Sequence, residues 1–182
     1  MIKIPTTNRR AFTLIETLVA ITLLMMAVIA PMSLASQSLS SAYYARDEIT
    51  ASNLAQEAIE AVRDARDGQI LQLAIDPSAT VNIFGPIPVD ADFIIDTASN
   101  AVTLCNTYPG GVCPPIKTDG SLFGYTTGWT NTAFTRTVHA SYVPGSTDEM
   151  RVRSTVTWRT GSYPARSTSI HENLYRWVND NN

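Results

Sequence analysis

The N-terminal part of the chain contains one long apolar run. Residues 12–35 read FTLIETLVAITLLMMAVIAPMSLA, and Glu16 is their only ionisable side chain. A helix of this length rises about 36 Å at 1.5 Å per residue, which exceeds the roughly 30 Å hydrocarbon core of a bilayer. The pattern therefore predicts a membrane-spanning helix.

Charged residues are distributed unevenly around this run. Lys3, Arg9 and Arg10 precede it without any acidic residue, and the next charge after Glu16 is Arg46. Basic residues are retained on the cytoplasmic side of a membrane segment. We therefore expect the N-terminus in the cytoplasm and the rest of the chain outside.

A second helical pattern follows the apolar run. Residues 36–45 are mostly small or polar, and residues 46–67 (RDEITASNLAQEAIEAVRDARD) repeat apolar side chains at three- to five-residue steps. We predict an amphipathic helix over 36–67 that continues the membrane segment and ends at Gly68. Its expected apolar face consists of Ile49, Leu54, Ala55, Ala58, Ile59 and Val62.

Prolines and glycines break residues 68–182 into short segments. Alternation of apolar and polar residues is clearest in 134–142 and 149–158. The predicted class is α+β, with the long helix packed on an antiparallel β-sheet head. Residues 173–178 are expected to close the head, and residues 179–182 to form a frayed tail. The expected strands are 80–84, 92–96, 101–105, 122–125, 134–142, 149–158 and 166–171. Their expected inward side chains are Phe134, Val138, Ala140 and Tyr142 on one strand and Met150, Val152, Val156 and Trp158 on the next.

Two interpretations of Glu16 are open at this point. A charged residue at the centre of a spanning helix costs on the order of 2.5–3.5 kcal/mol, so such residues are functional candidates by default. Alternatively, the side chain lies one turn into the segment and reaches back to the headgroups. The surrounding residues favour function: Arg10-Ala11, then Phe12-Thr-Leu-Ile-Glu16 and an unbroken apolar helix, resemble the type IV prepilin signature.

This resemblance implies a processing step and a role in assembly. A prepilin peptidase would cut between Ala11 and Phe12 and N-methylate the new Phe12 amine. Glu16 would become the fifth mature residue, where the family's glutamate neutralises the N-terminal amine of a neighbouring subunit. The family more often has Gly than Ala before the cut. Pro31 lies near the position where related pilins bend, and a bend between Ala27 and Pro31 is expected from proline chemistry alone.

The resemblance also implies partners. They are the prepilin peptidase, other pilin or pseudopilin subunits, the inner-membrane assembly platform and membrane lipid. Without residues 1–11 the chain keeps ten of its thirteen basic residues and all sixteen acidic ones, a net charge of −6. Nucleic-acid binding depends on clusters of Lys and Arg, and an acidic head of this kind predicts no direct binding to nucleic acid.

Cys105 and Cys113 flank a Pro-Gly-Gly turn. An even pair of cysteines in an exported domain predicts a disulfide, which would contribute about 2–3 kcal/mol. Two free thiols or half of a metal site are the alternatives, and no histidine lies near them in the sequence.

Residues for catalysis are sparse. His139 alternates with the inward residues of its strand and so points outward, and His171 is expected at a strand end. Asp90, Asp92 and Asp96 lack the spacing of a calcium loop. No enzyme activity and no cofactor are predicted. Residues 122–129 (LFGYTTGW) either contact a partner or fold back on the sheet.

The resulting hypothesis is a minor type IV pilin or a type II secretion pseudopilin. The run from Leu54 to Arg63 also resembles the helical segment of such proteins. The alternatives are a secreted binding domain, cut by signal peptidase after Ser33-Leu34-Ala35, and a signal-anchored extracellular domain. The apolar run is longer than an ordinary signal and contains Glu16. Which machine the subunit serves stays open: surface pilus, secretion pseudopilus or DNA uptake.

Overall fold

The computed structural model describes residues 12–161 and 163–178. The chain divides between Tyr43 and Tyr44 into two compact units. The first unit contains the N-terminal part of helix α1 (Leu14–Ile75), and the second contains the rest of α1 and the sheet. The predicted leader 1–11 and the predicted tail 179–182 lie outside the described residues.

Helix α1 does not end at Gly68, so that prediction is wrong. The helix continues to Ile75, and Leu73 in the added turns is buried. Its end is set by Asp76-Pro77, because proline disfavours helical backbone in the preceding residue and has no N–H. The Asp76 carboxylate then accepts hydrogen bonds from the backbone N–H and the hydroxyl of Ser78.

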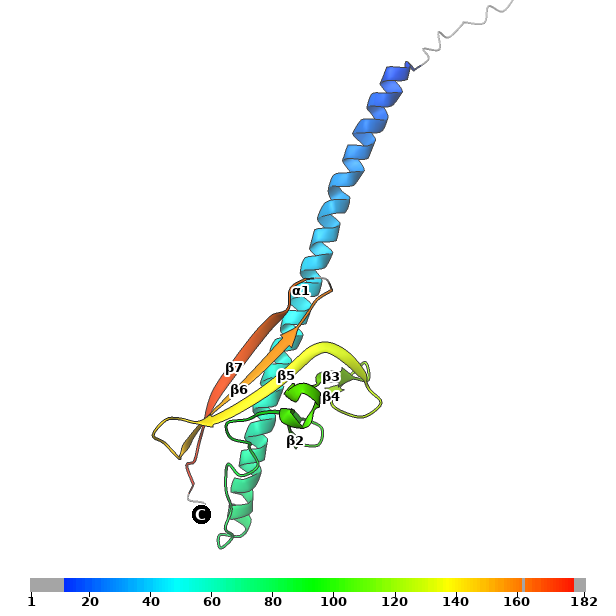
Figure 1. Cartoon of the computed structure of the whole chain (residues 1–182). Helices are drawn as coiled ribbons and strands as arrows, with labels where there is room; N and C mark the ends of the chain where they lie inside the picture. Colours follow the sequence, from blue (N-terminus) through cyan, green and yellow to red (C-terminus); the bar gives the residue numbers. More distant parts are fainter. Residues whose placement is uncertain (1–11, 162, 179–182) are drawn as a thin grey trace, which may run out of the picture. The chain divides into compact units, whose positions relative to one another are not determined.

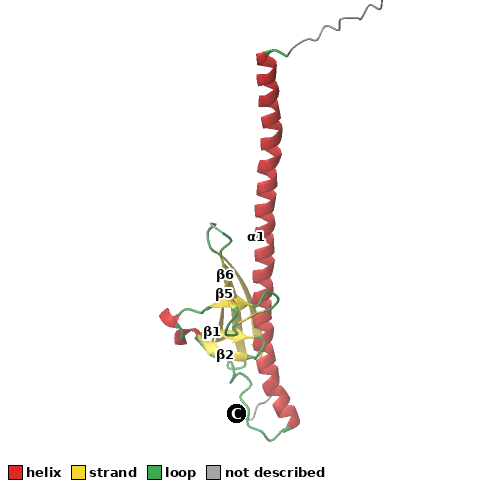
Figure 2. Ribbon diagram, turned by 90° about the vertical axis from the view of Figure 1, so that its right-hand side faces the viewer, coloured by secondary structure: helices red, strands yellow, loops and turns green. Residues whose placement is uncertain are grey.

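The second unit contains a seven-stranded antiparallel sheet (Figures 1 and 2). The strands follow the order β2-β1-β5-β3-β4, and β6 pairs with both β5 and β7. The predicted α+β class is confirmed, with a long N-terminal helix on an antiparallel sheet in a pilin-like fold. The strands are β1 (Asp92–Asp96), β2 (Ala101–Leu104), β3 (Pro115–Thr118), β4 (Phe123–Gly124), β5 (Thr130–Tyr142), β6 (Glu149–Trp158) and β7 (Arg166–Tyr175).

Strand β5 is the longest strand and pairs with three others, β1, β3 and β6. One edge pairs with β1 near Val138 and with β3 near Thr135, and the other edge pairs with β6 along nine residues. Its alternation places Phe134, Val138 and Ala140 in the core, as predicted. Tyr142, the fourth residue predicted to face inward, contacts the ring of Phe84 but is 37% exposed.

Two strand predictions at the edges of the head are wrong. Residues 80–82 have no regular secondary structure and 83–84 lie in a turn, and their apolar side chains pack into the core without strand pairing. Residues 166–171 and 173–178 do not form separate segments, since β7 runs without a break to Tyr175. His171 therefore lies within the strand and not at its end.

The second unit packs one face of α1 against the sheet (Figure 2). Three alanines at the contact, Ala51, Ala55 and Ala58, are fully buried and allow the helix backbone to approach the strands closely. Each large apolar side chain buried here contributes about 1.5–3 kcal/mol. The predicted apolar face is correct except at Ile49, which is 62% exposed.

Candidate functional site

The first part of α1 has no apolar partner within its own unit. Every residue from 12 to 39 is exposed, including the large side chains of Leu14, Ile15 and Leu24. An 18-residue window of α1 has a mean hydropathy of 2.4, which makes the helix long and apolar enough to cross a membrane. A continuous apolar surface of this size marks contact with a membrane or another protein. These features fit a membrane-anchored protein.

Glu16 occupies the first turn of this apolar helix. The hydroxyl of Thr13 accepts a hydrogen bond from the backbone N–H of Glu16 at 3.3 Å. The spacing Thr13-x-x-Glu16 is that of a capping box, in which the N-cap side chain satisfies an N–H that the helix leaves free. The carboxylate also lies at the positive end of the helix dipole, which stabilises a negative charge.

The surroundings of Glu16 leave its carboxylate available. Among the described residues no cation pairs with it, and it is the only ionisable residue between Phe12 and Ala35. Phe12, whose amine the cleavage would free, is 78% exposed, whereas Ala11 lies outside the described residues. Pro31 lies inside α1, and the bend that its chemistry predicts stays a prediction.

Arg136 is the residue of the head that the sequence pattern missed. It lies on the inward face of β5 and is 1% exposed. Its guanidinium donates to the carbonyl of Leu54 on α1 at 3.0 Å and to the carbonyl of Ile95 on β1 at 2.7 Å. Glu57 lies at 3.5 Å as its counter-charge. One buried cation therefore joins the helix to two strands.

Two further contacts complete the surroundings of this guanidinium. It lies over the ring of Tyr125 at 5.9 Å, and burial raises the pKa of the Tyr125 phenol, although the nearby charge of Arg136 opposes this effect. The hydroxyl of Thr97 donates to the carboxylate of Glu57. The ion pair is thus enclosed by groups from the helix, the sheet and a loop.

A second ion pair joins the helix to the sheet. Arg63 on α1 contacts Glu172 on β7 at 2.5 Å, and it also contacts Glu60 one turn earlier. The hydrogen bond to Glu172 raises the pKa of the Arg63 guanidinium above its ordinary value. Both groups are partly exposed, so this pair contributes less to stability than the buried Arg136.

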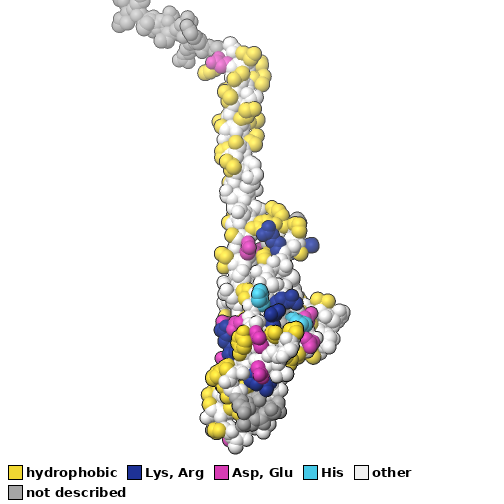
Figure 3. Space-filling model, turned by 90° about the vertical axis from the view of Figure 1, so that its left-hand side faces the viewer, with side chains coloured by type: hydrophobic (Ala, Val, Ile, Leu, Met, Phe, Trp, Pro, Cys, Tyr) yellow, Lys and Arg dark blue, Asp and Glu magenta, His cyan; other side chains and the backbone are white. Residues whose placement is uncertain are grey.

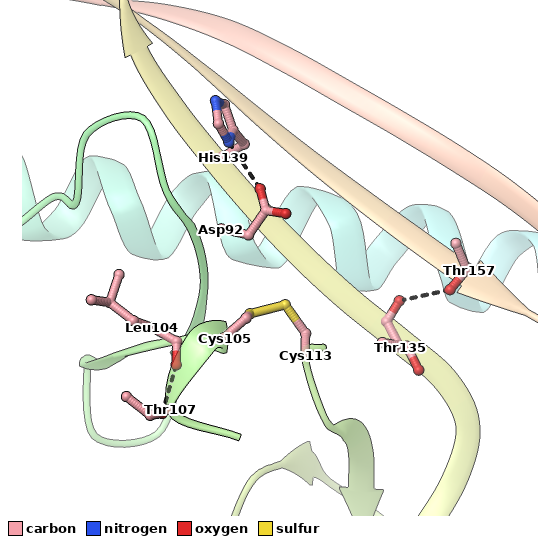
Figure 4. Close-up of a disulfide and its surroundings, with 8 residues drawn as sticks. All are labelled: Asp92, Leu104, Cys105, Thr107, Cys113, Thr135, His139 and Thr157. Atoms are coloured by element: carbon pink, nitrogen blue, oxygen red, sulfur yellow. Dashed lines mark hydrogen bonds and ion pairs between the residues drawn. A yellow bond between two sulfur atoms is a disulfide. The ribbon is translucent and has the colours of Figure 1, made fainter. Parts of the chain in front are cut away.

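Cys105 and Cys113 form a disulfide (Figure 4). Gly110 and Gly111 between them have φ angles of 76° and 68°, which glycine adopts without steric cost. The bridge packs with Ile94 and Tyr108 on the face of the sheet opposite to α1. It closes a short loop on a part of the sheet that the helix does not cover.

Reducing this disulfide is expected to lower the free energy of unfolding by about 2–3 kcal/mol, because the unfolded chain regains loop entropy. Unfolding of the full chain in detergent, with and without reductant, measures the difference. The Cys105→Ser/Cys113→Ser variant controls for other effects of the reductant, and it should unfold identically in both conditions. An unchanged wild-type midpoint would contradict the prediction.

Of the histidines and aspartates that the sequence singled out, the structure brings His139 and Asp92 together. His139 points outward, as its alternation predicts, and its Nδ1 lies 2.8 Å from the Asp92 carboxylate (Figure 4). Asp96 instead accepts a hydrogen bond from Ser99. No group of three potential metal ligands occurs in 12–161 and 163–178.

Residues 122–129 fold back on the sheet in part. Phe123 and Tyr125 pack on the core, whereas Leu122 is exposed. Of the two alternatives for this segment, the structure therefore supports packing for its aromatic residues.

The N-terminal segment of the chain matches a known family model. Residues 6–30 match the family model of the prokaryotic N-terminal methylation motif, which supports the type IV prepilin-like family. The match covers the predicted cleavage position, Glu16 and most of the apolar run. No curated protein and no solved structure matches the chain. The family assignment therefore rests on the N-terminal segment, and the head has no matched relative.

Proposed function

We propose that this chain, whose residues 6–30 carry the prokaryotic N-terminal methylation motif, is a minor type IV pilin or a type II secretion pseudopilin. In this role it is a structural subunit without catalytic activity. It enters a helical filament through its N-terminal helix after the leader is cut between Ala11 and Phe12. The observation that carries the proposal is Glu16, which no cation among the described residues pairs, in the first turn of a helix whose apolar residues up to Leu39 are all exposed.

In the proposed role, the exposed apolar surface of residues 12–35 has a partner both before and after assembly. In the precursor, membrane lipid covers residues 12–35, with the basic leader in the cytoplasm and the head outside. In the filament, the same side chains pack against other subunits. Transfer from lipid to protein contacts has little hydrophobic driving force, since both surroundings are apolar. A polar interaction is therefore needed to make assembly favourable and to define its geometry.

Glu16 and the Phe12 amine provide this interaction. Each is costly to bury alone in an apolar environment, and pairing the carboxylate of one subunit with the amine of its neighbour removes both costs. Cleavage creates the amine, so processing must precede incorporation. Pro31 removes one helix hydrogen bond and leaves the carbonyl of Ala27 without that donor. We expect the bend there to help the helix fit between its neighbours.

The proposal predicts that incorporation depends on the peptidase. Cells with and without the prepilin peptidase are separated into membrane and sheared-filament fractions, and the chain is detected through its head. With the peptidase, the chain is expected in both fractions. Without it, the chain should remain in the membrane as the longer precursor. Equal recovery from filaments in both strains would contradict the proposal.

A further inference from the structure

The outward face of β5, β6 and β7 carries a group of polar and basic side chains. In register across the three strands lie His139, Arg153 and His171, and the next row contains Ser141, Arg151 and Asn173. We call these six residues the basic face. They line a hollow of about 680 Å³, and Figure 3 shows both histidines beside Lys or Arg side chains on this surface.

The arginines of the basic face differ from most arginines of the head. Arg63, Arg66, Arg136, Arg166 and Arg176 each lie within 4.0 Å of a carboxylate oxygen. Within the described part of the chain, Arg151 and Arg153 have no such partner, although the chain has more acidic than basic residues. Arg151 donates instead to the side-chain carbonyl of Asn173 at 3.4 Å. Two adjacent cations thus remain available to an external anion.

Hydrogen-bonding groups surround these two cations. Thr137, Thr155 and Ser169 form the next row on the same face, and the hydroxyls of Thr155 and Ser169 lie 2.8 Å apart. At the other end of the face, Tyr175 is exposed in register with Glu149. The surface therefore combines a small positive centre with hydroxyl, amide and imidazole groups and one aromatic ring. Two carboxylates lie at its edges and are already engaged, Asp92 with His139 and Glu149 with Asn173.

The groups of the basic face favour one class of partner over two others. A stable protein partner requires a buried apolar or aromatic centre, and the rows of the basic face contain no aliphatic side chain. Single-stranded nucleic acid is bound by several stacking aromatic rings, whereas Tyr175 is the one aromatic ring in the described rows of this face. An acidic carbohydrate matches better, because its carboxylates pair with arginine and its hydroxyls bond to Ser, Thr and Asn groups.

We propose that the basic face binds an acidic polysaccharide, with Arg151 and Arg153 holding carboxylate groups along the sugar chain. The two arginines lie two residues apart on β6, a spacing of roughly 6.6–7 Å. They can thus contact different carboxylates of one polymer, so weak exposed contacts act together. This binding site does not depend on incorporation into a filament.

The test uses the full chain in detergent micelles and measures binding to polygalacturonate fragments. The fully methyl-esterified polymer is the ligand control, because it keeps the sugars and removes the charge. Arg151→Gln/Arg153→Gln is expected to weaken binding about tenfold or more, because both charge-assisted contacts are lost. The matched control, Arg159→Gln, changes an exposed arginine just beyond the end of β6 and should bind like the wild type.

Several results would overturn the proposal. They are equal binding by the double variant and the wild type, equal binding of the esterified polymer, and no binding by the wild type. Tighter binding of polyglutamate or single-stranded DNA would assign the face to a protein or nucleic-acid partner instead. The unfolding midpoint of the double variant should match that of the wild type, since both side chains are exposed.

Discussion

Glu16→Ala is expected to leave membrane insertion intact and to remove the chain from filaments. Insertion depends on the apolar run, which the substitution makes more apolar. Incorporation fails because the amine of the neighbouring subunit then enters an apolar environment without a counter-charge. Such a charge costs on the order of 2.5–3.5 kcal/mol, so the filament-bound fraction should fall on the order of 100-fold. Quantifying the chain in membrane and sheared-filament fractions measures both effects.

The hydrogen bond between Thr13 and Glu16 calls for two matched controls. Glu16→Gln keeps a side chain that suits the third position of a capping box and removes only the charge. It should fail to incorporate, as Glu16→Ala does. Thr13→Ala removes the cap and keeps the charge, and it should incorporate normally. Normal incorporation of Glu16→Gln would contradict the charge-pairing role, and failure of Thr13→Ala would assign the effect to the helix terminus.

Arg136→Ala is expected to destabilise the head by about 2–4 kcal/mol. The substitution removes two charge-assisted hydrogen bonds, leaves the carbonyl of Ile95 buried without its donor, and opens a cavity between α1 and β5. Loss of stability on this scale lowers the melting temperature by about 5–15 °C in a domain of this size. Thermal unfolding of the full chain, followed by near-ultraviolet circular dichroism, measures the shift.

Two variants separate the contributions of Arg136. Arg136→Met fills most of the same volume without charge, so it should cost less than Arg136→Ala, since the desolvation of the cation no longer opposes folding. Arg159→Ala removes an exposed arginine and should change stability by less than about 0.5 kcal/mol. If Arg136→Ala unfolds at the wild-type temperature, the buried arginine does not join the helix to the sheet.

The sequence predicted those elements whose periodicity is long and uninterrupted. Strands β1 and β6 have the predicted bounds, and the four apolar residues predicted to face inward on β6 are buried. The predicted apolar face of α1 is correct except at Ile49. The end of α1 was placed too early because Gly68 was treated as a terminator. A single glycine costs a helix about 1 kcal/mol relative to alanine, and burial of Leu73 in the following turns offsets this cost.

The buried Arg136 is absent from the prediction because the residues expected to face inward on its strand were all apolar or aromatic. Strict alternation in β5 places position 136 on the same face as Phe134 and Val138, so the signal was present in the pattern. The hydrogen-bond partners of Arg136 cannot be predicted from the alternation along its strand. Two of them are backbone carbonyls on α1 and β1, and only the three-dimensional pairing of these elements brings them to the guanidinium.

The basic face required the register of three strands. His139 points outward as predicted, whereas His171 was predicted at a strand end and lies within β7. The structure aligns both histidines with Arg153 because β7 continues to Tyr175. The register of two paired strands depends on the turn that connects them. The sequence pattern alone does not specify the turn between β6 and β7, so it does not specify which residues of these strands lie opposite one another.

The most direct test of the central proposal is the intact mass and N-terminal residue of the chain extracted from the membranes of its native cell. Our account predicts a chain that begins at Phe12 and carries one additional methyl group on its amine. A chain that begins at Ser36 would instead be a secreted domain, and an uncut chain that begins at Met1 would be a plain signal anchor. Either result would contradict assembly through Glu16 and the Phe12 amine.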